Sequence, residues 1–282
     1  MSVTHDEAVC LRHREWSETS QTVILLTRRH GLINGIAKGS RRERAAFSGG
    51  FELLQVGELG FIPRPDKDLI TLTEWDLTNP YLALRSRYAA SALAMFAGEL
   101  TMSLLAQGDP HPRVLDALLM LLDESTTAAA PMADCRPLSR FLAALLNDTG
   151  QFPDIGSAAG PAASVRMFDP AQARLVEGSH GSVQARDPFS PGEQHGVWPI
   201  RSETIDLLRA VGDGRETGQA EKGEPARWTR VARFLAAWVV YRSGRRPASL
   251  DTFLRITRFE GRSPAAGQDD PPVGRSLRHD RP

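Results

Sequence analysis

The chain has 282 residues, of which 41% are hydrophobic and 24% charged, a balance typical of globular proteins with two or three domains. Its 34 basic and 34 acidic residues cancel, so the net charge indicates no particular partner. The two cysteines, Cys10 and Cys135, are too few for a disulfide framework or a four-cysteine metal site, and they fit a reducing compartment. The N-terminus has no signal-peptide core, and no apolar run approaches the roughly 18–20 residues that span a bilayer. We therefore expect a cytoplasmic protein.

Residues 1–78 consist largely of short apolar or alternating runs separated by glycine and proline. They predict five strands, at 8–16, 22–28, 31–38, 51–62 and 69–77. Gly31 follows three basic residues and predicts a tight hairpin between the second strand and the third. Five short strands in this length are typical of a small barrel or sandwich. The five-stranded barrel that binds oligonucleotides and oligosaccharides, the OB fold, is a strong candidate.

After residue 78 the apolar residues recur at helical spacing. Asn79 and Pro80 form a helix-opening signal, so one long helix is predicted from Tyr81 to Gln107. Further helices are predicted at 112–124, 137–148, 203–211, 226–243 and 248–257. The apolar faces of these helices must cover one another, which predicts a mainly helical second domain.

Between these helices, residues 151–200 are rich in Gly, Pro and Ser and predict a small, poorly packed hairpin with strands at 163–168 and 173–177. The fold class is therefore α+β. The predicted organisation is an OB-fold domain at 1–78, a first helical part at 79–150, the hairpin insertion at 151–200, a second helical part at 201–260 and a disordered tail at 261–282.

No enzyme motif occurs in the sequence. The stretch GLINGIAKGS at 31–40 resembles a phosphate-binding loop but lacks the G-x-x-x-x-G-K-[ST] spacing. Ser17-Glu18-Thr19 fits a turn between strands better than a catalytic group. His180 and His195 have no cysteine companion, so they do not indicate a zinc site. We expect no catalytic residue, no cofactor and no bound metal.

The strongest functional signal is the basic segment at 27–44. Six basic residues stand there against the single acid Glu43, a local balance of +5. They are Arg28, Arg29, Lys38, Arg41, Arg42 and Arg44. Glycines beside them let a ligand approach the backbone, and the strands involved belong to the part of an OB barrel that binds oligonucleotides. These residues are the predicted DNA contacts. The alternative is that they form a solvated face and that the barrel contacts only protein.

Three segments resemble the RecO family of bacterial recombination mediators. The first is DEAVCLRHREWSETSQTVILLTRRHGLINGIAKGSRR at 6–42, with Leu26-Thr27, Gly31 and Lys38-Gly39 in the family's order. The others are NPYLALRSRYAASALAMFAGEL at 79–100, similar to the family's long helix, and FLAAWVVYRSGRRPASLDTFL at 234–254, similar to its closing helix pair. The resemblance covers nearly the whole chain.

This resemblance implies a protein without enzymatic activity, associated with the nucleoid. Its expected roles are to bind single- and double-stranded DNA, to anneal complementary strands, and to help load the RecA recombinase onto strands coated by single-strand-binding protein. It also implies a partner mediator, RecR. The family docks the acidic, apolar-ended tail of single-strand-binding protein on its helical domain, for which Arg227, Arg230 and Arg233 are the candidates. The apolar stripe beside them consists of Val231, Leu235, Trp238 and Val239. The alternative for that stripe is the protein core.

In one respect the chain departs from the family pattern. Many RecO proteins carry a four-cysteine zinc ribbon after a Gly-x-x-Pro motif. The motif is present as Gly150-Gln151-Phe152-Pro153, but DIGSAAGPAAS at 154–164 and SHGSVQARD at 179–187 contain no cysteine. We therefore expect the hairpin to persist without metal.

Overall fold

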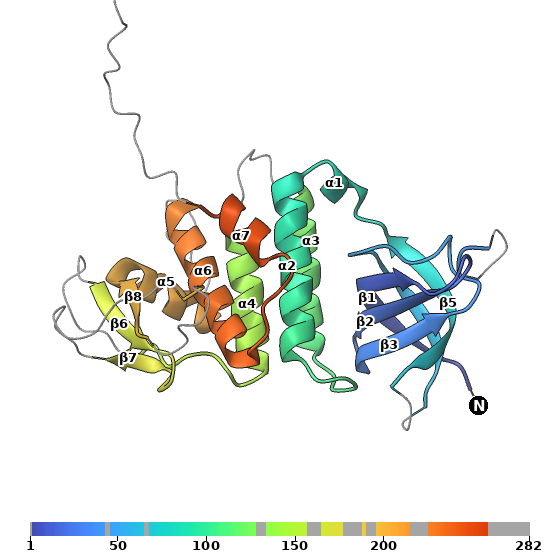
Figure 1. The fold of residues 1–282 in the computed structure, drawn as a ribbon, viewed down its shortest axis with the longest axis horizontal. Coiled ribbons are helices and arrows are strands. Elements are labelled where there is room, and N and C mark those ends of the chain that lie inside the picture. Colours follow the sequence, from blue (N-terminus) through green and yellow to red (C-terminus); the bar gives the residue numbers. More distant parts are fainter. Residues whose placement is uncertain are drawn as a thin grey trace, which may run out of the picture.

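The computed structural model describes residues 2–42, 46–64, 68–127, 134–156, 165–176, 188–189, 196–214 and 225–258. Arg44 and the predicted tail at 261–282 lie outside these ranges. Along the long axis of the molecule a β-barrel is followed by a bundle of helices and then by a small sheet (Figure 1). None of the described helices is long and apolar enough to cross a membrane.

The N-terminal region is a closed five-stranded barrel with the strand order β1-β2-β3-β5-β4. Its strands are β1 (Thr4–Glu15), β2 (Gln21–Thr27), β3 (Gly31–Ala37), β4 (Val56–Ile62) and β5 (Ile70–Asn79). β3 and β5 are parallel, whereas the other neighbouring strands are antiparallel. The predicted barrel and OB-type fold are confirmed. The fourth strand begins at Val56 and not at the predicted residue 51, because Phe47 and Phe51 leave the sheet and fill the barrel interior, where Phe51 packs against Trp75.

The link from barrel to helices differs from the prediction. The sequence predicts one helix from Tyr81 to Gln107, but α1 (Leu82–Arg85) and α2 (Tyr88–Leu104) are separate. Asn79 ends β5, and its side chain accepts a hydrogen bond from the Tyr81 N–H instead of capping the long helix. Tyr81 itself has left-handed backbone geometry (φ 44°), and its hydroxyl donates to Asp123, 2.8 Å away. This tertiary contact interrupts the helical pattern.

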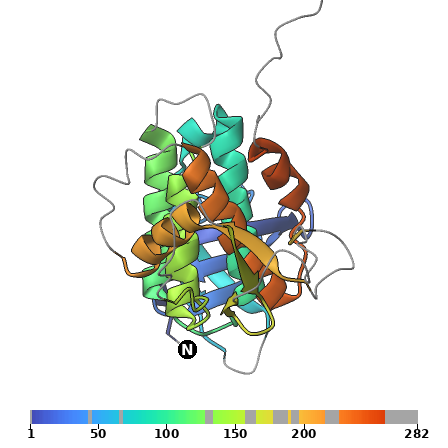
Figure 2. The same cartoon turned by 90° about the vertical axis from the view of Figure 1, so that its left-hand side faces the viewer.

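The remaining helices pack around a shared apolar core, as predicted. They are α3 (Pro112–Thr127), α4 (Arg136–Asp148), α5 (Ser202–Gly212), α6 (Pro225–Ser243) and α7 (Leu250–Ile256). Figure 2 shows these helices side by side in front of the barrel. Phe96 of α2 stacks on Phe253 of α7 with ring centroids 4.2 Å apart. The same core includes Leu26 and Leu32 from the outer face of the barrel, so the barrel and the helices are packed against each other.

Gly31 allows this packing to be close. A Cβ atom at this position would lie 2.1 Å from the carbonyl oxygen of Asp109, in the loop between α2 and α3. Its φ of 64° is also unfavourable for other residues. The glycine therefore serves the predicted hairpin and the contact with the helices at once.

The insertion after α4 contains a three-stranded sheet with the order β7-β6-β8. The prediction included β6 (Val165–Asp169) and β7 (Arg174–Val176) but missed β8 (Trp198–Arg201). The prediction of poor packing is wrong. Phe168 and Trp198 are buried against Phe234 and Trp238 of α6, with ring centroids 5.1–6.3 Å apart.

Candidate nucleic-acid interface

The basic residues predicted to bind DNA form two groups at opposite ends of β3. Arg28 and Arg29 lie in the turn before β3, whereas Lys38, Arg41 and Arg42 follow it. The seven residues of β3 separate the groups by about 20 Å, since a strand rises about 3.3 Å per residue. The two groups therefore have different surroundings.

Arg28 and Arg29 are engaged in contacts within the protein. The Arg28 guanidinium lies 2.7 Å from Glu7 of β1 and 2.8 Å from Asp116 of α3. Its hydrogen bonds to Asp116 and then to Glu7 raise the pKa of Arg28. Arg29 donates through its backbone and side chain to Asp6, which is 1% exposed. Arg28 thus links the barrel to α3, and the hydrogen bonds of Arg29 hold the β2–β3 turn against β1.

The second group is held against the turn between β1 and β2. Gly39, with a φ of 70°, donates its N–H to the Ser20 hydroxyl, and the Arg41 N–H donates to the Thr19 carbonyl. The Arg41 side chain forms an ion pair with Glu15 at 2.6 Å. No carboxylate among the described residues pairs with Lys38 or with Arg42, and both are exposed. Within the described ranges, these two cations are therefore the members of the group that no carboxylate neutralises.

Trp16 lies on the turn between β1 and β2, against which this second group is held. Its ring is 66% exposed, which is unusual for a large aromatic side chain. Cations beside an exposed ring are the combination that binds single-stranded nucleic acid, since bases stack on the ring while phosphates pair with the cations. We call Trp16, Lys38, Arg41 and Arg42 the barrel-edge surface. The sequence prediction omitted Trp16, although a tryptophan next to a polar turn was the available signal.

A cavity of about 350 Å³ lies on the outer face of β1 to β3 and contains two further arginines. Its lining includes Arg12, Arg14, Thr22 and Asn34, together with one acid, Asp68. A β-bulge between Cys10 and Arg12 shifts the register of β1, so that Arg12 pairs with Ile24 and Arg14 with Thr22 on the outer face. Both arginines are exposed, and no described carboxylate pairs with them. The sequence prediction did not include them.

The arginines predicted to bind the acidic tail belong to α6. Arg227 and Arg230 form ion pairs with Glu203 of α5. Arg233 donates to the Thr257 hydroxyl at 3.3 Å. The apolar stripe beside them is buried, with Val231, Leu235 and Val239 at 0% exposure. The stripe is therefore core, which was the alternative left open by the sequence.

Two family models together match nearly the whole described chain. The one described as recombination protein O N terminal matches residues 1–81, and the one described as recombination protein O C terminal matches residues 85–251. The chain belongs to the recombination protein O family. It is a DNA repair protein of this family, whose members are called RecO. The barrel described above is the OB fold of the family's N-terminal region.

Individual RecO proteins are similar to this chain to different extents. DNA repair protein RecO from Anaeromyxobacter sp. (strain Fw109-5) is 30% identical over 249 residues, which cover 85% of this chain and 91% of that protein. The RecO protein of Anaeromyxobacter sp. (strain K) is 27% identical over 244 residues, covering 86% and 92%. The RecO protein of Syntrophobacter fumaroxidans is 34% identical over 118 residues, which span only 42% of this chain and 46% of that protein.

The zinc ribbon of many RecO proteins does not fit the residues of this chain. The chain has two cysteines, one inside the barrel on β1 and the other next to the start of α4. Burial raises the pKa of the Cys10 thiol to about 12 and that of the Cys135 thiol to about 11, which disfavours the thiolate that a metal requires. Within the described ranges no three His, Cys, Asp or Glu side chains are grouped as metal ligands.

Proposed function

We propose that this protein acts as a recombination mediator. It binds single- and double-stranded DNA, promotes annealing of complementary strands, and helps to load a recombinase onto strands coated by single-strand-binding protein. The observation that carries the proposal is the barrel-edge surface of an OB barrel. There the exposed Lys38 and Arg42, which no described carboxylate pairs with, follow β3 in a segment that is hydrogen-bonded to the turn carrying the exposed Trp16. This activity requires no bond-breaking step and no catalytic residue.

The mechanism follows from phosphate neutralisation. Cations that hold the backbones of two strands lower the repulsion between them, so complementary bases can approach and pair. Contacts to phosphates position a strand without reading its sequence, as annealing of arbitrary sequences requires. Stacking on Trp16 adds about 1–3 kcal/mol for an unpaired base. It also favours strands that are still single.

The partners are proposed on the basis of family membership. They are RecR, the acidic tail of single-strand-binding protein and, indirectly, the recombinase RecA. Carboxylates of the tail would pair with Arg227, Arg230 and Arg233, competing with Glu203 for the first two. A location in the cytoplasm, close to the nucleoid, follows from a role on DNA.

The competing function is that of an adaptor whose barrel contacts only protein. It is favoured by the ion pairs that already occupy Arg28, Arg29 and Arg41. An adaptor would leave the rate at which complementary oligonucleotides anneal unchanged.

Strand annealing tests the proposal. Two complementary oligonucleotides, one carrying a fluorophore and the other a quencher, are mixed with the full-length protein. We expect the triple variant Lys38→Ala/Arg41→Ala/Arg42→Ala to anneal them more slowly than the unmodified protein. The matched control replaces three exposed arginines of other elements, Arg85, Arg113 and Arg174. Equal losses in both variants would mean that general charge, not the barrel edge, drives annealing.

A further inference from the structure

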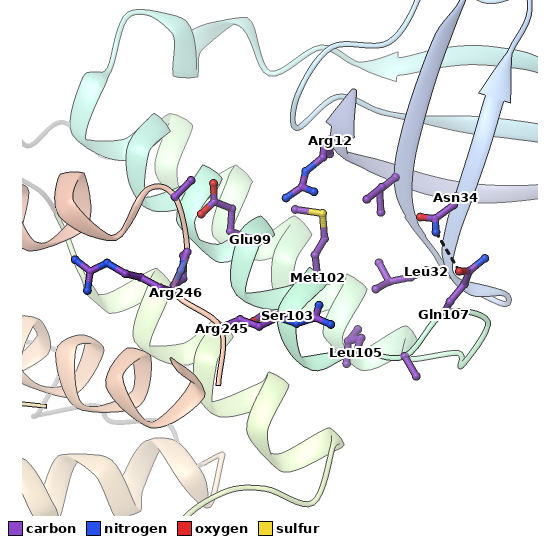
Figure 3. Close-up of a pocket in the computed structure, with 14 residues that line it drawn as sticks. Arg12, Leu32, Asn34, Glu99, Met102, Ser103, Leu105, Gln107, Arg245 and Arg246 are labelled. Atoms are coloured by element: carbon purple, nitrogen blue, oxygen red, sulfur yellow. Dashed lines mark hydrogen bonds between the residues drawn. The ribbon is translucent and has the colours of Figure 1, made fainter. Parts of the chain in front are cut away.

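A second cavity, of about 650 Å³, lies between the barrel and the helices. Its walls come from three parts of the chain that are distant in sequence: the outer face of β1 to β3, the C-terminal end of α2 with the residues after it, and the loop between α6 and α7 at 244–249. Figure 3 shows side chains from these three parts around the cavity, with Arg12 on the barrel side and with Arg246 directed away from the barrel. We call this cavity the barrel–helix cleft.

The rim of the cleft is cationic. Arg12 stands on the barrel side, and Arg245 and Arg246 stand on the α6–α7 loop. No carboxylate in the described ranges pairs with Arg12 or Arg245, whereas Arg246 pairs with the largely exposed Asp251 at 2.7 Å. The acid within the cleft is Glu99 of α2.

Glu99 offsets one of the three positive charges of this rim, and its carboxylate also holds the loop. Its carboxylate accepts hydrogen bonds from the Ser249 N–H at 3.0 Å and from the Ser249 hydroxyl at 2.9 Å. These bonds tie the α6–α7 loop to α2. They keep Arg245 and Arg246 on the opposite rim from Arg12, and the net charge of the cleft is positive.

The floor of the cleft is apolar with one amide pair. Ile24, Leu32 and Met102 provide apolar surface, and on the barrel side of the cleft Asn34 donates to Gln107 at 3.0 Å (Figure 3). A nucleotide strand presents apolar base faces, amide-like base edges and anionic phosphates. The floor and the rim match these three features.

The cleft continues the groove on the barrel. It shares Arg12, Ile24 and Asn34 with the 350 Å³ cavity, which extends to Arg14 and Thr22 near the β1–β2 turn. One path therefore leads from the barrel-edge surface along β1 to β3 and into the cleft. This face of β2 and β3 is the one on which OB folds bind oligonucleotides.

We propose that the barrel–helix cleft binds an unpaired segment of DNA, with phosphates held by Arg12 on one side and by Arg245 and Arg246 on the other. The proposal rests on the proposed function and extends it, because it makes the helical region part of the single-strand site. Cavities of roughly 300–1,000 Å³ enclose small ligands, so the cleft holds about one or two nucleotides and excludes a duplex. The double variant Arg245→Ala/Arg246→Ala should therefore affect single strands selectively.

The test measures the affinity of the full-length protein for a fluorescent oligothymidine and for a duplex, each at several salt concentrations. Losing two phosphate contacts should reduce the slope of log affinity against log salt by about 1.4 for the single strand. When salt rises from about 50 to 200 mM, single-strand affinity should therefore fall by a factor about sevenfold smaller in the variant than in the unmodified protein. Duplex binding should be unchanged. The control variant Arg85→Ala/Arg174→Ala, which removes two exposed arginines outside the cleft, should retain the original slope.

Three outcomes would overturn the inference. If the double variant keeps the single-strand slope, or loses single-strand and duplex binding alike, the cleft is not a single-strand site. If it keeps the slope but loses affinity for an acidic peptide with an apolar end, the cleft accepts a protein segment instead. If the unmodified protein shows no salt-dependent binding to single strands, the proposed function fails and the inference fails with it. Arg12→Ala, on the barrel side, should reproduce about half of the change in slope.

Discussion

Replacing Arg28 by Ala should lower stability more than it lowers DNA affinity. This arginine pairs with Glu7 of the barrel and Asp116 of α3, so its loss removes an electrostatic link between the barrel and the helices. Its side chain is 33% exposed, and solvent therefore screens both pairs. For partly exposed pairs the contribution is about 0.2–1 kcal/mol each, which gives a total near 1 kcal/mol.

A loss of about 1 kcal/mol should lower Tm by about 2–4 °C in a protein of this size. The assay is thermal unfolding of Arg28→Ala, Asp116→Ala and the double variant at low and high salt. The two single variants should be non-additive, since they remove the same bond, and the differences should shrink at high salt. An unchanged Tm for Arg28→Ala, together with a flatter salt dependence of DNA binding, would refute the structural role assigned to Arg28.

Four further outcomes follow from the structure. Trp16→Ala should weaken binding to single strands by about 1–3 kcal/mol and leave duplex binding nearly unchanged in a fluorescence titration, whereas an equal loss on both would exclude stacking. Ser249→Ala, which removes the hydroxyl bond to Glu99 and leaves the charge of the cleft unchanged, should loosen the α6–α7 loop and lower single-strand affinity. An unchanged affinity would show that the loop needs no such anchor. A chelator should leave Tm unchanged, and stoichiometric zinc in untagged protein would contradict this expectation. Above about pH 9 the free energy of unfolding should fall, because unfolded thiols ionise while folded Cys135, with a pKa of about 11, stays protonated. In denaturant titrations Cys135→Ala should show a smaller fall. An identical fall would assign the effect to other groups.

The barrel and most helices could be predicted because their signals are local. Alternating or helical spacing of apolar residues is set by neighbours in the sequence, and nearly all these elements appear within a few residues of the prediction. The missed break at Tyr81 depends on a bond to Asp123, which is distant in sequence. Strand β8 was missed for a similar reason, since its stability comes from packing of Trp198 on α6.

The candidate site was harder to predict because charge counts do not show where a side chain points. The six basic residues of 27–44 look like one patch in the sequence, but β3 separates the five that the structure describes into two groups. Arg12 was missed because strict alternation from the buried Cys10 would place it inside the barrel, and the bulge reverses this. Arg245 and Arg246 approach Arg12 only when the helices pack on the barrel.

We propose that the barrel-edge surface binds the DNA backbone. This proposal is tested most directly by titrating single-stranded DNA at several salt concentrations with the unmodified protein and with Lys38→Ala/Arg41→Ala/Arg42→Ala. We expect the variant to bind every sequence more weakly. Its slope of log affinity against log salt should be flatter by about 0.7 per lost contact, or about 1.4 for Lys38 and Arg42 together. Unchanged affinity and slope would mean that these residues are only a solvated face of the barrel.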